Sequence, residues 1–277
     1  MTARIDLHTH SNRSDGVLPP AALVALAAQR QVELLALTDH DTTAGCDEAR
    51  AACLVHGIRF LPGVELTCLW RGREIHVVGL NPDIAQPPFI AHCAHVLELR
   101  RQRIASMSQR LSRAGLPGAA LSAEALAAAA PTRAHLARAL CALGLASSMQ
   151  AAFDRWLKRG QPGYVASQWP ELASAVGCIV GAGGTAVLAH AHRYPLSNGV
   201  LRELLGEFKT AGGVGLEVSL AGMGPSDADR VATLARRFEL HGSIGSDFHE
   251  PGLPWRPLGR FAKLPDRIMP ITARLGL

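Results

Sequence analysis

The feature that most constrains the fold is a series of short β-prone runs, most of which end in a cluster of polar residues. Between the early runs lie helix-like stretches such as Pro19–Gln31 and Thr43–His56. Alternation of strands with helices favours a mainly parallel sheet. The seven runs are Ala3–Thr9, Glu33–Thr38, Ile58–Glu65, Glu74–Leu80, Thr185–His190, Val214–Ser219 and Gly242–Ser246. Seven strands favour an α/β barrel over an open sheet.

Residues 89–169 differ from the rest of the chain. They are rich in Ala, Leu and Arg with helical periodicity, and they contain no strand-like run. We expect them to form a helical insertion between the fourth and fifth strands, and residues 1–88 and 170–277 to form the barrel. An insertion at the loop face of a barrel would cap a site there. Residues 70–73 are expected to form the hairpin turn between the third and fourth strands.

Charge and cysteine spacing restrict the classes of protein that the chain can belong to. The longest uncharged stretch, near Ala173–Ala189, contains four glycines and predicts a buried helix, turn and strand rather than a membrane span. Six cysteines form no CxxC pair, so free thiols are expected. The N-terminus lacks the pattern of a secretory signal, which predicts a cytoplasmic protein without a membrane partner. The net charge of +5 weakly favours an anionic partner, and no obligate protein partner is indicated.

Three of the polar clusters place metal-binding side chains at strand ends. His8 and His10 close the first run, Asp247 and His249 follow the last, and His40 follows the second between two aspartates. Side chains two residues apart on a strand point to the same side. Ligands that converge from several strand ends are what a metal site requires. Imidazole and carboxylate ligands without thiolate suit manganese, iron or zinc in a hydrolytic site.

Four further residues are expected to complete this site. Glu65 and His190 end the third and fifth runs, His76 lies on the fourth, and Asp15 follows the first. Each has an ordinary explanation when taken singly: a histidine such as His76 is commonly a hydrogen-bonded core residue, and an aspartate before glycine such as Asp15 shapes turns. Because six of the twelve histidines fall at or near strand ends, the metal site is favoured over these separate explanations.

These residues resemble the motifs of the polymerase and histidinol phosphatase (PHP) family. The four motifs are His8-Thr9-His10, Thr38-Asp39-His40-Asp41, Leu188-Ala189-His190 and Ser246-Asp247-Phe248-His249. Ala191 departs from the family, which usually has proline at that position. The resemblance implies a distorted (β/α)7 barrel that holds two or three divalent metal ions, with manganese expected and iron or zinc as alternatives.

The resemblance also implies how the ligands divide among three ions. The implied groups are His8, His10, Glu65 and Asp247 for the first ion, Glu65 with His76 and His190 for the second, and Asp15, His40 and His249 for the third. Asp247, Glu65 and His190 would form the catalytic centre. Asp39 and Asp41 are expected to orient imidazoles from behind.

Within the family, the chain is similar to the TrpH/YciV-type branch, on the basis of residues 131–138 and 160–165 of the insertion. That similarity implies a phosphatase that removes the 3′-phosphate of nucleoside 3′,5′-bisphosphates, giving nucleoside 5′-monophosphate and phosphate. It also implies 5′-to-3′ exoribonuclease activity on short RNA, as in some members. The alternatives are a histidinol-phosphate-type or other small-molecule phosphomonoesterase and, in another class, a non-catalytic metal-binding scaffold. The complete ligand set argues against the scaffold.

Five residues are expected to bind the substrate, in particular a second phosphate. Arg133 and His135 lie at the start of a predicted helix, where backbone N–H groups favour anions. Arg193 closely follows the histidine of the third motif, and its guanidinium can bind two phosphate oxygens at once. Ser197 and Asn198 would donate further hydrogen bonds. A surface charge at Arg133 and a packing role for His135 are the alternatives.

Overall fold

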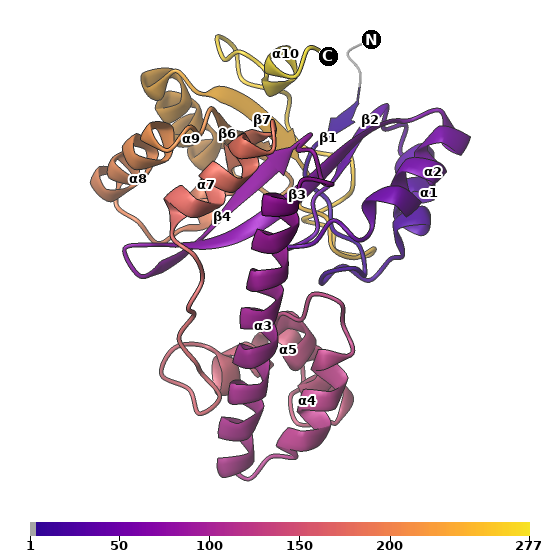
Figure 1. Cartoon of the computed structure of the whole chain (residues 1–277), viewed down its shortest axis with the longest axis vertical. Helices are drawn as coiled ribbons and strands as arrows, with labels where there is room; N and C mark the ends of the chain where they lie inside the picture. The colour runs from indigo at the N-terminus through magenta and orange to yellow at the C-terminus, as the bar shows by residue number, and fades with distance from the viewer. Residues whose placement is uncertain (1–3) are drawn as a thin grey trace.

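The computed structural model describes residues 4–277, and at its centre is a seven-stranded sheet that nearly closes into a barrel (Figure 1). The strands follow one another in chain order: β1 (Ile5–Asp6), β2 (Leu34–Leu37), β3 (Arg59–Trp70), β4 (Arg73–Leu80), β5 (Thr185–Leu188), β6 (Gly215–Leu220) and β7 (His241–Gly245). Leu7 N donates to Ile244 O at 3.2 Å and so joins the first strand to the last. The seven predicted strands and the distorted barrel are confirmed.

One strand runs against the others. β4 is antiparallel to both β3 and β5, whereas the remaining neighbours are parallel. Arg71 and Gly72 form the predicted hairpin turn with φ of 49° and 71°, the two positive values of a type I′ turn. Because β3 continues past Glu65 into this hairpin, His76 of β4 pairs with Thr67 and lies beside the end of the parallel strands.

Helices cover the outside of the barrel on both sides (Figure 1). They are α1 (Pro20–Gln29), α2 (Cys46–His56), α7 (Leu172–Gly181), α8 (Asn198–Thr210), α9 (Pro225–Phe238) and the short α10 (Ile271–Arg274). The first two agree with the predicted helices, and the uncharged stretch near residues 173–189 forms the predicted helix, turn and strand. Within residues 4–277, no helix is both long and apolar enough to cross a bilayer. The six cysteines are free thiols.

The helices between β4 and α7 form a second lobe with its own core. They are α3 (Pro87–Arg113), α4 (Gly118–Leu126), α5 (Arg133–Ala142), α6 (Met149–Ala152) and the π-helix η1 (Phe153–Leu157). The long α3 belongs to both lobes. Near its start Phe89 packs in the barrel core, whereas near its end Met107 and Leu111 pack with Leu121 and Leu140 of the insertion. The insertion therefore extends away from the barrel along α3 (Figure 1).

A buried arginine fixes α3 to the barrel. Arg100 donates from Nε to Asp41 Oδ2 at 2.7 Å and from Nη2 to Thr67 Oγ1 at 2.6 Å. Asp41 also accepts from Thr67 N at 2.7 Å, so its carboxylate is fully engaged. The prediction that Asp41 orients an imidazole is therefore wrong; it holds the insertion in place instead.

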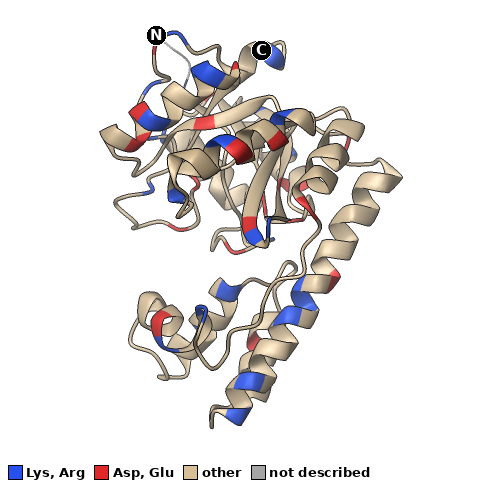
Figure 2. Ribbon diagram, turned by 90° about the vertical axis from the view of Figure 1, so that its left-hand side faces the viewer, with Lys and Arg blue, Asp and Glu red and all other residues tan. Residues whose placement is uncertain are grey.

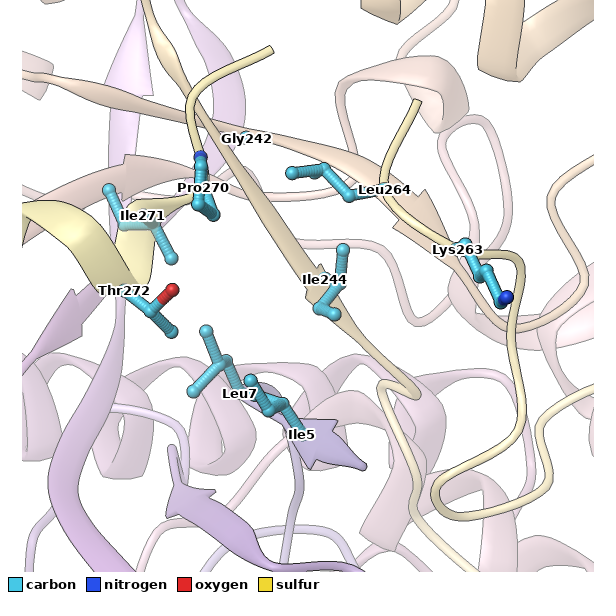
Figure 3. Close-up of a pocket in the computed structure, with 9 residues that line it drawn as sticks. All are labelled: Ile5, Leu7, Gly242, Ile244, Lys263, Leu264, Pro270, Ile271 and Thr272. Carbon is cyan, nitrogen blue, oxygen red and sulfur yellow. The ribbon is translucent and has the colours of Figure 1, made fainter. Parts of the chain in front are cut away.

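The two ends of the barrel differ in polarity. The interior at the N-terminal ends of the strands is filled by apolar side chains such as Leu34, Leu61 and Val187, with Ile271 of α10 beneath them. A cavity of about 400 Å³ lies at this end beside β1 and β7 (Figure 3). Its lining consists of Ile5, Leu7, Gly242, Ile244, Lys263, Leu264, Pro270, Ile271 and Thr272. Because these side chains are almost all apolar, the polar chemistry lies at the other end.

Candidate metal centre

The nine side chains predicted as metal ligands lie together at the carboxyl end of the parallel strands. They come from the segments that follow β1 (His8, His10, Asp15), β2 (His40), β5 (His190) and β7 (Asp247, His249), and from β3 (Glu65) and β4 (His76). All are buried except His76 and His249, which are half-buried. Residues up to 241 positions apart in the sequence thus share one polar cluster.

Glu65 is at the centre of the cluster. Its carboxylate is 1% exposed. Five imidazole nitrogens lie within 3.4 Å of it: His8 Nε2 (3.4 Å), His10 Nε2 (3.3 Å), His40 Nδ1 (3.0 Å), His76 Nδ1 (3.0 Å) and His190 Nε2 (2.8 Å). One carboxylate surrounded by five imidazoles can bridge two cations, because its two oxygens face different nitrogens.

One group of ligands lies on the side of β1. His8 Nε2 and His10 Nε2 are 3.0 Å apart, and Glu65 completes a group that could hold one ion. Asp247 Oδ1 lies 3.5 Å from His8 Nε2 and 3.4 Å from His10 Nε2. Four lone-pair donors therefore converge on one position, in the combination that the family resemblance implies.

Two further groups share residues with the first. Asp15, His40 and His249 approach one another as expected, with Asp15 Oδ1 at 3.3 Å from His249 Nε2 and 3.7 Å from His40 Nε2. His10 also belongs to this group, and His40 joins Glu65 and His76 in the other. His10 and His40 each turn one ring nitrogen towards Glu65 and the other towards Asp15. The division into three sets is therefore less sharp than the resemblance implies.

The hydrogen bonding of the cluster fits divalent cations. Buried polar atoms in proteins almost always have a hydrogen-bond partner, and an unpaired one costs free energy. Among the described residues, four ligand atoms lack such a partner: Asp15 Oδ1, His40 Nδ1, Glu65 Oε2 and His190 Nδ1. Three of these face the interior of the cluster, where bound cations would satisfy them.

Charge in the cluster is strongly coupled. Burial opposes ionisation of Glu65, but the imidazoles of His40, His76 and His8 outweigh it and hold the pKa of Glu65 well below its usual value. Burial likewise lowers the pKa of His10, but Asp247 and Glu65 raise it to about 9. The pKa of His76 rises to about 10, mainly through Glu65. The carboxylates therefore require positive charge beside them, which protons or metal ions can provide.

Two of the ligands adopt a left-handed backbone conformation that is uncommon outside glycine. His190 has φ of 29° and Asp247 has φ of 51°. Hydrogen bonds from their N–H groups hold both, since His190 N donates to the Glu217 side chain (Oε2) at 2.5 Å and Asp247 N donates to His8 O at 2.8 Å. Such conformations cost on the order of 1–3 kcal/mol each and persist where the surroundings impose them. Here they turn both side chains into the cluster.

Glu217 supports the ligands and was not predicted. It lies on β6, and its Oε1 accepts from His8 Nδ1 at 2.7 Å while its Oε2 accepts from His190 N. This leaves His8 Nε2 free to face the cluster. The available signal was a single charged residue within the buried run Gly215–Leu220, because buried glutamate is rare unless it has a partner.

Asp39 supports another ligand, as predicted, but through a serine. Its Oδ1 accepts from Ser14 Oγ at 2.6 Å, and Ser14 Oγ lies 3.4 Å from His10 Nδ1. Asp39 also accepts from Ser11 N and Ser11 Oγ, at 2.8 and 2.6 Å. These bonds fix the loop that carries His10 and Asp15.

Two arginines reach the edge of the cluster. Arg193, predicted to bind substrate, pairs with Asp247 Oδ2. Arg256 Nη1 lies 3.3 Å from the same oxygen, and no motif pointed to it. Arg193 follows the third motif in the short 3-10 helix Ala191–Arg193. Two guanidinium groups on one carboxylate oxygen make this edge of the site cationic.

The start of α5 also touches the cluster. Thr132 caps the helix and donates from Oγ1 to Asp15 Oδ2 at 3.2 Å. His135 completes the capping box, since its Nδ1 accepts from Thr132 N at 3.0 Å. Arg133 donates from Nη2 to Glu74 Oε1 at 3.0 Å, and Arg138 donates to Asp15 O at 2.6 Å. The insertion thus supplies polar groups directly beside the predicted ligand Asp15.

The last two predicted substrate residues lie elsewhere. Ser197 is exposed and caps α8, with its Oγ accepting from Val200 N at 3.4 Å. Asn198 is the exposed first residue of that helix. Within the described part of the chain, no hydrogen bond joins either residue to the ligand cluster.

Comparison with known proteins agrees with this geometry. The PHP domain profile matches residues 6–220. The chain is 44% identical to the 5′-3′ exoribonuclease Rnm of Escherichia coli, over 94% of this chain and 89% of that one. It is 42% identical to a 3′,5′-nucleoside bisphosphate phosphatase of Chromobacterium violaceum, over 99% and 96% of the two chains.

Solved structures agree as well. An amidohydrolase of Chromobacterium violaceum, with bound sulfate and no metal, superposes with a TM-score of 0.93 at 41% identity, over 99% of this chain and 96% of that one. A metal-dependent phosphoesterase of Bifidobacterium adolescentis superposes with a TM-score of 0.83 at 29% identity, over the same shares. The cluster of imidazoles and carboxylates, the barrel and these matches agree. The chain therefore belongs to the PHP family of metal-dependent phosphoesterases.

Proposed function

We propose that the chain removes the 3′-phosphate of nucleoside 3′,5′-bisphosphates and releases nucleoside 5′-monophosphate and phosphate. The observation that carries the proposal is the edge of the metal centre, where Arg193 and Arg256 share one oxygen of Asp247. The two guanidinium groups would add little binding free energy for an uncharged substrate, whereas they would form charge-assisted hydrogen bonds with a phosphate dianion. The relative from Chromobacterium violaceum, named for this activity, supports the choice of substrate.

The proposed roles follow from the contacts. Asp247, Glu65 and His190 are the proposed catalytic centre, with the other six predicted ligands completing the metal site. Bound divalent ions would act as Lewis acids, which lower the pKa of water and neutralise phosphate oxygens. Arg193 and Arg256 are held by Asp247 and can turn their remaining N–H groups towards the phosphate. Manganese is our proposed ion, with iron or zinc as alternatives.

We assign the 5′-phosphate to the start of α5. Arg133 is half-buried there, and binding to Glu74 leaves several of its N–H groups free. Thr132 connects His135 to Asp15, since its hydroxyl donates to Asp15 Oδ2 at 3.2 Å and lies 3.2 Å from His135 Nδ1. We do not extend the assignment to Ser197 and Asn198, because they lie at the exposed start of α8. The insertion then caps the site by holding one end of the substrate.

The same bond cleavage accounts for a 5′-to-3′ exoribonuclease activity. In a 5′-phosphorylated RNA, the first nucleotide carries a 5′-phosphate and is joined through its 3′ oxygen to the next phosphorus. Water attack at that phosphorus, with departure of the 3′ oxygen, releases a nucleoside 5′-monophosphate and leaves a new 5′-phosphate on the shortened chain. The relative from Escherichia coli, named for this activity, supports including short RNA among the proposed substrates.

The test compares two substrates that differ by one phosphate. With the enzyme loaded with Mn²⁺, kcat/KM for adenosine 3′,5′-bisphosphate should exceed that for adenosine 3′-monophosphate by at least about tenfold, since one charge-assisted contact contributes about 1.5–3 kcal/mol. Arg133→Gln should reduce this ratio without changing the rate on the monophosphate. Equal values for the two substrates in the wild type would contradict the assigned 5′-phosphate site.

A further inference from the structure

The positive charge of the chain is concentrated in the insertion. Residues 87–170 contain ten Arg and Lys residues against three Asp and Glu, a net charge of +7, whereas the whole chain carries +5. The barrel segments are therefore slightly acidic, with 18 basic and 20 acidic residues. Figure 2 shows Lys and Arg repeated along the part of α3 that extends away from the barrel.

Some of these basic residues form ion pairs within the protein. Arg100 and Arg103 are buried against Asp41 and Glu74. The six exposed basic residues are Arg101, Arg110, Arg113, Arg155, Lys158 and Arg159. The insertion offers them few partners, because its three acidic residues are Glu98, Glu124 and Asp154 and only Asp154 forms an ion pair, with Lys158. The exposed charge is therefore in excess of what folding requires.

Four of the exposed residues form one basic patch: Arg110, Arg113, Lys158 and Arg159. Arg110 Nε donates to Pro162 O at 3.0 Å, which ties the end of α3 to the turn that follows η1. Arg110, Arg113 and Pro162 line a hollow of about 350 Å³. Lys158 and Arg159 lie in the same turn, where Gln161 N donates to Lys158 O. The patch is open to solvent and borders this hollow.

The patch is connected to the metal centre by α3. Arg100 binds the barrel beside the cluster, and Arg110 and Arg113 follow it by ten and thirteen residues. At 1.5 Å per residue these lie about 15–20 Å further along the helix axis. A single strand with a stacked spacing of 3.4 Å would span this distance in about five nucleotides. A mononucleotide in the metal centre cannot reach the patch.

We propose that the basic patch binds the phosphates of an RNA strand whose 5′-terminal nucleotide occupies the metal centre. The proposal rests on the exoribonuclease activity proposed above. Single strands bind in positively charged grooves by their backbone, without regard to sequence. The patch suits such a strand for three reasons. Its cations outnumber the nearby carboxylates, they are open to solvent, and they lie a few nucleotides from the scissile bond. The patch thereby holds the shortened RNA for the next cleavage.

The test separates long from short substrates. Arg113→Gln with Arg159→Gln removes two positive charges from the patch, and Arg236→Gln with Arg237→Gln removes two from the exposed end of α9 as the matched control. The substrates are adenosine 3′,5′-bisphosphate and a 5′-phosphorylated single-stranded RNA of about twelve nucleotides. Each phosphate contact on a single strand contributes a salt slope of about 0.7, so the patch variant should raise the KM for RNA by about three- to tenfold at low salt.

The patch variant should leave kcat/KM for the bisphosphate within about twofold of the wild type, and its effect on RNA should disappear at high salt. An unchanged KM for RNA would overturn the proposal. A loss on the bisphosphate equal to the loss on RNA would also overturn it, since a surface that holds only the strand cannot slow a mononucleotide. So would an equal effect of the α9 control.

The proposal can fail independently of the exoribonuclease activity. If the wild type releases no mononucleotide from RNA but cleaves the bisphosphate, the exoribonuclease half of the proposed function is wrong. Fluorescence anisotropy with the same labelled RNA in the presence of a chelator then tests the patch alone. Weaker binding by the patch variant than by the α9 control supports the patch, and equal binding contradicts it.

Discussion

Glu217 supports two of the predicted metal ligands from behind. It accepts from the His8 ring on one oxygen and from His190 N on the other. The first bond fixes the tautomer of His8, so that Nε2 carries the lone pair that faces the cluster. The second holds His190 in its left-handed conformation. One side chain thus fixes the ring of one ligand and the backbone of another.

Replacing Glu217 by Gln should therefore weaken metal binding while leaving the barrel folded. Loss of such a supporting partner commonly costs about 10- to 100-fold in metal affinity. Metal titrations followed by activity would measure the change, with Glu203→Gln on the exposed face of α8 as the control. An affinity equal to that of the wild type would show that Glu217 does not support the ligands.

The site should bind metal more tightly as the pH rises. In the metal-free cluster the pKa of His10 is about 9 and that of His76 is about 10, above the usual 6.5, so both hold protons at pH 7. Metal ions bind neutral imidazole, and binding must release these protons. Affinity should rise by about tenfold per pH unit for each proton released, up to about pH 9. Calorimetric titration with Zn²⁺ in buffers of different ionisation enthalpy measures the proton release; none between pH 6 and 8 would contradict the account.

The sequence could predict a site residue only where its function is indicated by the residues next to it in the chain. His8 and His10, or Asp247 and His249, can be recognised because each pair lies within one strand-end motif. Glu217 and its role could not, because what it binds depends on which strands are neighbours in the barrel. Arg256 was missed for the same reason: it reaches Asp247 from an irregular segment with no motif of its own.

At the scale of elements, α3 joins the insertion to the barrel through Arg100. Arg100 is 6% exposed, and its guanidinium binds both Asp41 and Thr67. Removing one partner of a buried ion pair leaves an uncompensated charge, and the carboxylate of Asp41 would then keep only the amide of Thr67.

Arg100→Ala should lower the free energy of unfolding of the protein by about 3 kcal/mol. The neighbouring Arg101 is exposed, so Arg101→Ala should stay within about 0.5 kcal/mol of the wild type. Urea unfolding monitored by circular dichroism measures both. Equal stability of the two variants would mean that Arg100 does not anchor the helix.

The elements themselves followed closely from hydrophobic patterning, but their lengths did not. The first predicted strand, Ala3–Thr9, pairs regularly only over Ile5–Asp6. Ala3 lies outside the described residues. The residues after Asp6 leave the regular pairing where His8 turns into the cluster. β3 is longer than predicted, because it continues past Glu65 to Trp70, through residues that were not predicted as strand, into the predicted hairpin turn. Burial patterns give the face of a strand, whereas the point at which pairing stops depends on the neighbouring strand.

At the scale of the molecule, the fold separates stability from chemistry. One end of the barrel interior is filled by apolar side chains, and the opposite end gathers three carboxylates that need positive charge. Metal binding should therefore stabilise the folded protein strongly. At a metal concentration about 1,000 times Kd the gain is about 4 kcal/mol.

Differential scanning calorimetry in Mn²⁺ against a chelator should show this gain as a higher melting temperature, by several degrees for a chain of this size. Asp247→Asn should reduce the increase, and Asp266→Asn, which changes an exposed aspartate outside the cluster, should not. An identical melting temperature with and without metal would show that the nine side chains do not form a metal site.

The most direct test of the proposed function is to identify which phosphate is lost. The metal-loaded protein is incubated with adenosine 3′,5′-bisphosphate, stopped with chelator, and the products are separated by ion-exchange chromatography. Adenosine 5′-monophosphate and phosphate should appear in equal amounts, and Asp247→Asn should slow their release by at least about 1,000-fold, since it removes a ligand of the metal that activates water. Adenosine 3′-monophosphate as the product, or an equally active Asp247→Asn variant, would contradict the account.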